Sequence, residues 1–290
     1  MEKRTLEELI LKYELEPSLF DIYVEGDSDV CCINIFLDEL KYNNIGVFEI
    51  GFIDIPSDFL EFIKLENNNR GRVIALSQIF LSKGITSNNV LCLIDRDFDN
   101  LLNVDHSNDI LYYTDYSCME AYIFDTHVIN KFVINNYSSF NVSIAVMLDE
   151  FYLVLQELFL IRCANKELGW NLLSYDFLKQ CNIVGNSEIV FDSQEYVKRY
   201  LNKNNKMDSL DIFIQSIEKN RSCVCADFRN QIHGHDFMKL FFWYLSRLKP
   251  KTKDMYNEES LWKTCFLCLD IKQMTQYNFF KAISECACSN

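Results

Sequence analysis

Residues 20–30, FDIYVEGDSDV, place a carboxylate at the point where a run of β-forming residues ends. The first half of the segment is rich in β-branched and aromatic residues and favours a strand, whereas the glycine and the polar residues after it favour a turn. Helical spacing then continues over residues 28–40, with Asp27 or Ser28 as the expected N-cap. The segment predicts a strand, a turn and a helix, with Glu25 at the carboxyl end of the strand.

The first 125 residues repeat this alternation of strand and helix. We expect strands at residues 20–26, 47–52, 90–94 and 110–113, and helices at 28–40 and 71–81. Strands separated by helices form βαβ units, whose strands run parallel. Continuous apolar strands such as 90–94 are typical of a sheet that helices cover on both faces.

Residues 126–290 have a mostly helical pattern. Apolar residues recur at helical spacing over 143–164, 193–200, 210–219, 236–248, 258–271 and 279–286, and polar loops are expected at 201–209 and 249–254. The sequence therefore predicts an α/β fold, with a mainly parallel sheet flanked by helices in residues 1–125 and a mostly α-helical region in 126–290. We expect the chain to divide near residue 125.

The composition is that of a globular chain. Its 290 residues are 49% hydrophobic and 14% aromatic, enough for one large core or two smaller ones. The N-terminal residues form no apolar signal segment, and the most apolar stretch, 143–164, contains Asp149, Glu150 and Glu157. A spanning helix needs about 20 mostly apolar residues, so we expect a buried helix there, no membrane association and a cytoplasmic location.

Twelve cysteines are scattered along the chain, and several lie inside apolar runs. In a reducing compartment most of them would be small core residues. Three pairs are candidate zinc ligands: Cys223 with Cys225, Cys265 with Cys268, and Cys286 with Cys288. Core packing is the favoured interpretation, because zinc knuckles usually combine two Cys-x-x-Cys units flanked by turns, whereas Cys265 and Cys268 have helical spacing in an apolar run.

The formal net charge of −14 is unevenly distributed. Residues 1–125 contain 9 Lys and Arg against 24 Asp and Glu, and residues 126–290 contain 19 against 18. Acid concentrated in one part of a chain is a sign of cation binding. The second part has two basic clusters that are candidates for phosphate contacts, with solvent-facing surface as the alternative: Lys198, Arg199, Lys203 and Lys206, and then Lys249, Lys251 and Lys253.

A second group of carboxylates follows the predicted strand at 90–94, in the sequence VLCLIDRDFD. Ligands of open α/β sheets bind outside the carboxyl ends of the strands, so Asp95, Asp97 and Asp99 are expected to converge with Glu25. If the chain stays extended, the three aspartates share one side. Oxygen-only ligation suits Mg²⁺ or Mn²⁺, which polarise phosphoryl oxygens and orient an attacking water.

Three other interpretations of the aspartates remain. They could form a solvated acidic turn. A calcium-binding EF-hand loop is disfavoured because Asn100 stands at the position that requires glycine. A phosphatase of the haloacid dehalogenase type also uses Asp-x-Asp after a strand, but its pattern continues with Thr or Val where this chain has Asp99.

Together these motifs resemble the TOPRIM domain, which topoisomerases, bacterial primases and OLD-family nucleases share. The resemblance is carried by Glu25, Gly26, Asp29 and Val30, followed about 70 residues later by the apolar strand and Asp-x-Asp-x-Asp. The segment YYTDYSCMEAYIF, which contains Ser117 and Glu120, is similar to the stand-alone TOPRIM nucleases that act as effectors beside an ATPase in PARIS-type anti-phage systems. The resemblance covers residues 18–127 and extends thinly to 233–246.

The resemblance implies a role for five carboxylates. Glu25 would be a metal ligand and a general acid or base. Asp95 and Asp97 would be catalytic metal-binding aspartates, and Asp99 would be a third, supporting ligand. Glu120 would be a further metal ligand or catalytic acid, with a helix-capping carboxylate as the alternative.

The resemblance also implies an activity. Residues 1–125 would bind metal and carry the catalytic site, and residues 126–290 would serve dimerisation, partner docking or substrate selection. The chain would be a Mg²⁺- or Mn²⁺-dependent endonuclease that cleaves nucleic acid, with RNA, including tRNA, as the favoured substrate. It would be the toxic effector of an anti-phage defence system, active as a homodimer and controlled by an ATPase sensor subunit. Two alternatives remain: an OLD-type DNA nuclease, and a non-catalytic binding subunit that a metal stabilises. No tyrosine can be assigned as a strand-passage nucleophile, and the zinc module of primases is absent.

Two further features bear on catalysis. In the sequence HGHD, at the start of a predicted helix, His235 is a candidate general acid or phosphate ligand, and His233 is a weaker one. The alternative is a polar helix cap in which Asp236 accepts from the end amides. Arg96, inside the aspartate motif, would neutralise its neighbours or clamp a phosphate. The chain contains no Walker-type loop, so ATP-dependent sensing would require a partner.

Overall fold

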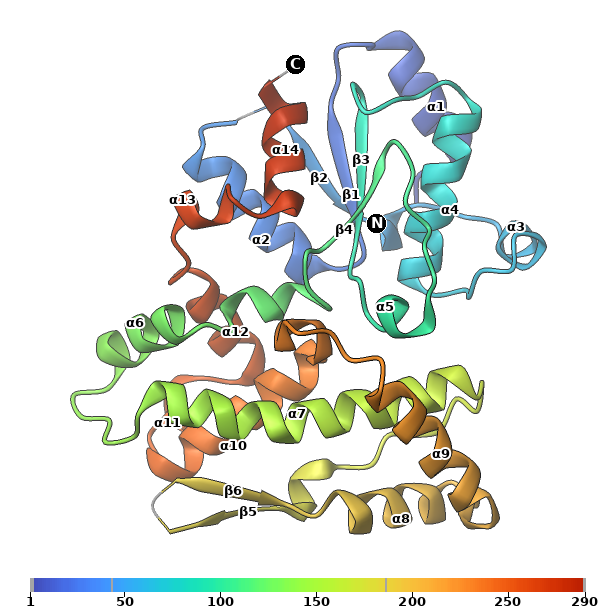
Figure 1. Ribbon diagram of the computed structural model, residues 1–290. Coiled ribbons are helices and arrows are strands. Elements are labelled where there is room, and N and C mark those ends of the chain that lie inside the picture. The colour runs from blue at the N-terminus through green and yellow to red at the C-terminus, as the bar shows by residue number, and fades with distance from the viewer. Residues whose placement is uncertain (1–2, 43, 186, 289–290) are drawn as a thin grey trace. The chain divides into compact units, whose positions relative to one another are not determined.

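The N-terminal part of the chain forms a four-stranded parallel sheet (Figure 1). The computed structural model describes residues 3–42, 44–185 and 187–288. The strand order is β2 (Gly46–Glu49), β1 (Asp21–Val24), β3 (Val90–Ile94) and β4 (Leu111–Tyr113). The predicted parallel sheet is confirmed, and β1 and β3 are direct neighbours at its centre.

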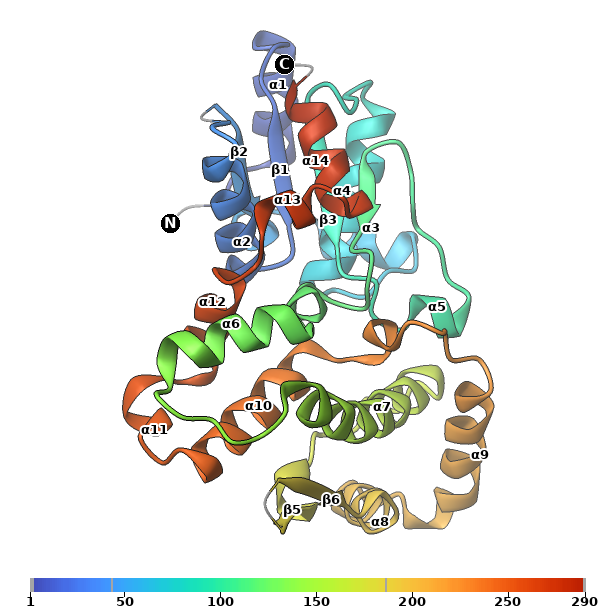
Figure 2. The ribbon, with the colours of Figure 1, turned by 60° about the vertical axis from the view of Figure 1, so that its left-hand side comes forward.

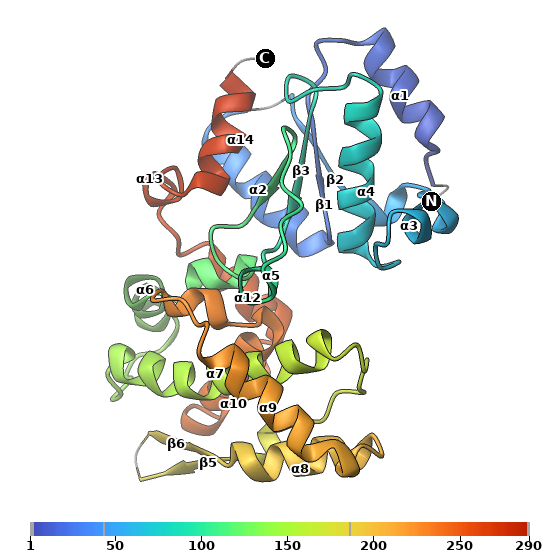
Figure 3. The ribbon, with the colours of Figure 1, turned by 45° about the vertical axis from the view of Figure 1, so that its right-hand side comes forward.

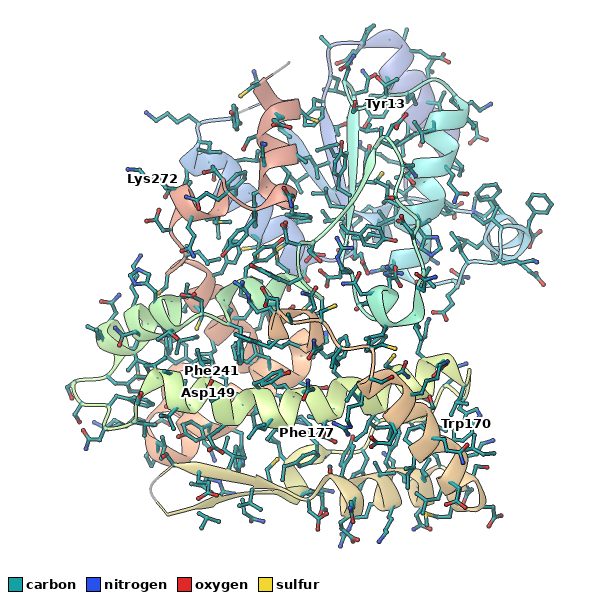
Figure 4. The ribbon with its side chains drawn as sticks, in the orientation of Figure 1. Tyr13, Asp149, Trp170, Phe177, Phe241 and Lys272 are labelled. Atoms are coloured by element: carbon teal, nitrogen blue, oxygen red, sulfur yellow. The ribbon has the colours of Figure 1, made fainter. Side chains whose placement is uncertain are left out.

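Helices cover both faces of this sheet, as Figure 3 shows for α1 (Leu6–Leu15) and α4 (Asn69–Ser82) on one face and α2 (Asp27–Glu39) and α14 (Asn278–Cys288) on the other. Alternate residues of the buried strands supply the two cores, because successive side chains point to opposite faces. Tyr13 of α1 points toward the sheet, where its hydroxyl donates to the buried carboxylate of Asp21 at 2.7 Å (Figure 4). On the opposite face the rings of Phe36 and Phe280 pack 4.8 Å apart.

Several element boundaries differ from the sequence-based expectation. The expected strand at 47–52 ends at Glu49, and Ile50–Phe52 form a 3₁₀ helix, η1. The N-cap of α2 is Gly26 rather than Asp27 or Ser28, and the carboxylate of Asp29 accepts its N–H at 3.1 Å. The periodicity analysis did not predict α1 or the short α3 (Ser57–Phe62).

The chain divides into two compact units that interleave along the sequence. The first contains residues 1–96, 105–115 and 270–290, and the second contains 97–104 and 116–269. The C-terminal segment, with α13 (Ile271–Met274) and α14, belongs to the first unit because the carboxylate of Asp115 accepts the N–H groups of Asn278 and Phe279 at 2.9 and 3.0 Å. The predicted division at residue 125 rests on a change in secondary-structure type, whereas these two units are defined by the contacts between residues.

The second unit is mostly helical, as expected, and is built around α7 (Ile144–Glu167). The aromatic rings of this unit pack closely. The ring centre of Phe151 lies 5.1 Å from that of Tyr244 and 6.0 Å from that of Phe241. Its other elements are α5 (Asp99–Leu102), η2 (Met119–Ile123), α6 (Thr126–Asn136), η3 (Phe177–Gln180), β5 (Cys181–Val184), β6 (Glu188–Phe191), α8 (Ser193–Lys203), η4 (Met207–Ser209), α9 (Leu210–Arg221), η5 (Phe228–Gln231), α10 (Gly234–Leu248), α11 (Thr252–Met255) and α12 (Glu258–Phe266). Figure 2 shows the β5–β6 hairpin and α8 together beside α7.

Some predictions for this unit were wrong in detail. The helix expected at 258–271 ends at Phe266, and helical turns occupy parts of the two expected loops. The sequence analysis missed α6 and the antiparallel hairpin. The predicted burial of residues 143–164 is confirmed by the α7 side chains in the core. In the part of the chain that the structure describes, no helix has both the length and the apolarity needed to cross a bilayer.

Candidate functional site

Glu25 and Asp95 lie at the carboxyl ends of two neighbouring strands in the first unit. Glu25 directly follows β1, and Asp95 directly follows β3. Glu25 Oε1 accepts a hydrogen bond from the main-chain N–H of Asp95 at 3.0 Å. The side chain of Asn69, at the start of α4, donates to the carbonyl oxygen of Glu25 at 2.8 Å. The expected convergence of these two strand ends is therefore confirmed.

Two arginines contact the main chain at the ends of these strands. Arg70 of α4 donates from Nε and Nη2 to the carbonyl oxygen of Asp95, at 3.3 and 3.2 Å. Arg96 donates from Nε to the carbonyl oxygen of Thr114 at 3.1 Å, and its guanidinium lies 5.0 Å from the ring centre of Tyr113. A guanidinium binds phosphate oxygens well, and its charge offsets the repulsion between carboxylates. Arg96 was predicted to do this, whereas no signal in the sequence linked Arg70 to Asp95.

Asp97 and Asp99 do not continue an extended strand, so the expectation that alternation aligns the three aspartates is wrong. The chain enters the second unit at Asp97, which has a left-handed backbone with φ 47°. Aspartate tolerates that conformation, and its N–H donates to the carbonyl oxygen of Ser117 at 2.7 Å. α5 begins at Asp99, which is only 8% exposed. The reversal at Asp97 removes the two-residue periodicity on which the expectation depended.

Ser117 connects η2 to the segment before α10 within the second unit. It is buried, and the single hydrogen of its hydroxyl is shared between the carbonyl oxygens of Arg229 and Ile232, which lie 2.8 and 2.5 Å from Oγ. These bonds fix the backbone three residues before Glu120. The sequence resemblance had singled out Ser117 without assigning it this structural role.

Glu120 packs directly against the first residue of α10. A Cβ atom added to Gly234 would lie 2.0 Å from Glu120 Oε2, so a larger residue at this position would require the Glu120 carboxylate to move. The carboxylate thus lies beside the N-terminal end of the 15-residue helix α10, and not only in the first turn of η2, to which Glu120 itself belongs. Its roles as a metal ligand and as a capping carboxylate of its own helix stay predictions.

The residues that follow Gly234 have separate environments. Asp236 is buried and accepts two hydrogen bonds from Arg162, at 2.5 and 2.7 Å, so it forms an ion pair rather than the expected helix cap. The Nδ1 atom of His233 is buried without a hydrogen-bond partner, 3.9 Å from Asp236 Oδ2. Burial lowers the pKa of His233 to about 4, so its ring is neutral at pH 7. His235, the preferred catalytic candidate, is exposed on the first turn of α10.

A bound metal ion requires several donor atoms that converge on one point. Among residues 3–42, 44–185 and 187–288, no group of three or more His, Cys, Asp or Glu side chains is arranged to hold a metal. Mg²⁺ commonly takes only one or two protein carboxylates and keeps several waters. Glu25 and Asp95 supply that number of hard oxygen donors. Asp97, Asp99 and Glu120 belong to the second unit, and their metal-binding role stays as the resemblance implies.

The predicted basic clusters make local contacts. Arg199 pairs with Glu195 at 2.7 Å, and Lys203 donates to the carbonyl oxygen of Ser174 at 2.6 Å. The ammonium of Lys206 lies 5.1 Å from the ring of Trp170, which Figure 4 labels at the edge of the second unit. Each of these contacts joins a basic side chain to another residue of the second unit. They agree with the alternative that these residues form solvent-facing surface. Phosphate binding by these clusters stays a prediction.

Comparisons with known proteins add no assignment. No family model matches the chain, and no curated protein matches it either. The function is therefore inferred from the residues, their geometry and the motif resemblance.

Proposed function

We propose that the chain is a Mg²⁺-dependent endonuclease of the TOPRIM type that cleaves phosphodiester bonds in nucleic acid, with RNA, including tRNA, as the favoured substrate. The observation that supports this proposal is the contact between Glu25 and the main chain of Asp95 at the ends of adjacent parallel strands. In open α/β sheets this edge is where ligands bind. The type of nuclease comes from the resemblance of the motifs around these residues.

The side chains at the strand ends would have distinct tasks. Glu25 and Asp95 would hold the ion, which, when bound, polarises a phosphoryl oxygen and activates a water. The carboxylate of Glu25 would accept the proton of the attacking water. Arg70 and Arg96 would bind the non-bridging oxygens of the scissile phosphate. The hydrogen bond from Asp95 N–H keeps Glu25 oriented, which reduces the reorganisation required during reaction.

The biological role follows from the resemblance alone. The chain would be the toxic effector of an anti-phage defence system, held inactive by an ATPase sensor subunit and active as a homodimer in the cytoplasm. Toxicity of the isolated chain on expression, relieved by Glu25→Gln, would support this role.

Cleavage assays with purified protein test the proposed activity. The wild-type chain, Glu25→Gln and Glu39→Gln are incubated with end-labelled tRNA, single-stranded RNA and duplex DNA, with Mg²⁺ or with EDTA. Glu39 is the matched control, because it is an exposed glutamate at the far end of α2. We expect cleavage of RNA that requires Mg²⁺, falls by about 100-fold or more in Glu25→Gln, and is unchanged in Glu39→Gln.

Two other results would replace the proposal. Cleavage of DNA alone would identify an OLD-type DNA nuclease. A Mg²⁺-dependent rise in melting temperature without cleavage, even with the partner ATPase present and activated, would identify a non-catalytic binding subunit. Equal cleavage by wild type and Glu25→Gln would reject the site.

A further inference from the structure

A small pocket of about 150 Å³ lies within the second unit, between α7, α8 and the start of α10. Its walls include four aromatic rings, those of Phe98, Tyr196, Tyr200 and His233. The rings of Tyr196 and Tyr200 stack on each other, with centroids 5.9 Å apart and an angle of 7° between their planes. Two polar side chains of α7, Arg162 and Asn165, also line the pocket and could contact a ligand. None of these six residues belongs to the predicted metal site.

The volume of the pocket limits the size of its ligand. An apolar cavity of about 150 Å³ in a protein admits one benzene ring. Drug-sized ligands occupy pockets of about 300–1,000 Å³. The pocket therefore suits a single planar six-membered ring, and its aromatic walls suit the faces of such a ring.

The polar groups in the lining are mostly hydrogen-bond donors. The ion pair with Asp236 uses Nε and Nη2 of Arg162, which leaves the N–H groups of Nη1 for a ligand. Asn165 Oδ1 accepts from the N–H of Leu172 at 3.1 Å, which leaves the amide Nδ2 as a donor. Burial raises the pKa of Tyr200 to about 12, so its hydroxyl stays protonated. A ring that carries acceptor atoms on its edge would satisfy these donors.

The charge of the pocket lining indicates whether the ligand is a neutral ring or an anion. Donors of this kind would also bind a phosphate, but the charge of Arg162 is balanced by the buried carboxylate of Asp236. A phosphate here would lie close to that carboxylate without a net positive charge to offset it, which is unfavourable in a partly buried site. The pocket therefore favours a neutral, acceptor-rich ligand.

We propose that this pocket binds a single pyrimidine base, the ring of a uridine or cytidine nucleotide, which accepts hydrogen bonds from Arg162 and Asn165 at its carbonyl oxygens while one of its faces contacts the tyrosine pair. The base would come from a free nucleotide or from an unstacked nucleotide of a single strand, the form in which proteins usually read RNA. The second source rests on the proposed nuclease function and would make the pocket a determinant of substrate choice. The first source does not depend on that function.

Calorimetric titration of the full-length Glu25→Gln chain in EDTA tests binding without cleavage. The ligands are UMP, CMP, AMP, GMP, ribose 5-phosphate and a six-nucleotide oligouridine. We expect UMP or CMP to bind roughly tenfold or more tightly than AMP and GMP, because a second ring exceeds the pocket. Ribose 5-phosphate should not bind, since it lacks the base. Binding of the oligouridine but of no mononucleotide would support the strand as the source.

Three variants locate the site. Ser174→Trp fills the pocket from its exposed rim and should abolish binding, whereas Ser138→Trp, at an exposed position that is not part of this lining, should not change it. Tyr200→Phe keeps the ring, removes one donor and should weaken binding by about five- to tenfold. Equal binding by Ser174→Trp and Ser138→Trp, binding of ribose 5-phosphate as tight as that of UMP, or no binding of any ligand would overturn the proposal. Because cleavage is not measured, none of these results depends on the nuclease assay.

Discussion

The carboxylate of Glu25 accepts a hydrogen bond from the main-chain N–H of Asp95, 3.0 Å away. These residues follow two adjacent parallel strands, β1 and β3, which are 65 residues or more apart in sequence. This bond places two acidic residues side by side at the carboxyl edge of the sheet. Acidic side chains that meet at one edge of a sheet repel each other, and a bound cation or an arginine offsets that repulsion. Arg70, which donates to the carbonyl oxygen of Asp95, supplies part of that offset.

Cation binding at this pair should be measurable as stability. In Glu25→Gln the amide oxygen can still accept from Asp95 N–H, so the fold should persist, and in EDTA its free energy of unfolding should equal or exceed that of wild type. At a cation concentration 100 times Kd, wild type should gain about 2.7 kcal/mol from Mg²⁺ or Mn²⁺, and the variant should gain almost none. Urea unfolding with and without cation gives these values. An equal gain in Glu25→Gln would place the cation elsewhere, and Glu39→Gln is the control.

The contact between Glu120 and Gly234 should produce strong coupling between the two positions. Gly234→Ala should destabilise wild type by about 1–3 kcal/mol, because the added methyl group displaces the Glu120 carboxylate. In a Glu120→Ala background the same substitution should be neutral or stabilising, by up to about 1 kcal/mol, since alanine is the better helix former. Urea unfolding of the four proteins forms a double-mutant cycle. Additive effects would show that the two residues are not in contact.

Stability should depend on the protonation of His233. Its pKa is lowered to about 4 by burial, whereas the unfolded chain has an ordinary histidine near 6.5. Between these values the unfolded state binds a proton that the folded state does not, so stability should fall as pH drops from 6.5 to 4, by about 2–3 kcal/mol. His233→Gln should remove this part of the pH dependence, and the exposed His127→Gln should not. The comparison is made by urea unfolding at pH 7.5, 6.0 and 5.0. Identical pH slopes in wild type and His233→Gln would contradict the assignment.

Asp115 should hold the C-terminal helix against the first unit. Its carboxylate accepts two N–H groups at the start of α14, so Asp115→Ala should cost about 1–2 kcal/mol, the usual cost of losing a helix cap. Hydrogen exchange should show faster exchange at Asn278 and Phe279 in particular. Asp109→Ala, which changes an exposed aspartate near β4, is the matched control. Unchanged protection of these two amides would mean that other contacts hold α14.

The failures of the sequence analysis have identifiable causes. At Asp97 the prediction assumed a continued strand, but a left-handed residue reverses the chain, and aspartate adopts that conformation without an obvious sequence signal. The hairpin formed by β5 and β6 was missed because each strand buries only one of its four residues, so burial imposes little apolar pattern on the sequence there. Arg70 lies 25 positions before Asp95, so no local pattern connects them.

The sequence by itself determined the features that depend on short-range periodicity and composition. These are the βα alternation, the parallel sheet, the helical second part, and the position of Glu25 and Asp95 at the ends of apolar strands, because burial of alternate or helically spaced residues imposes those patterns locally. Tertiary structure alone decided that Glu25 contacts Asp95, that Glu120 packs on Gly234 and that Arg162 neutralises Asp236. Such contacts join residues far apart in the chain, and which of them form depends on how whole helices and strands pack, information that no single segment carries.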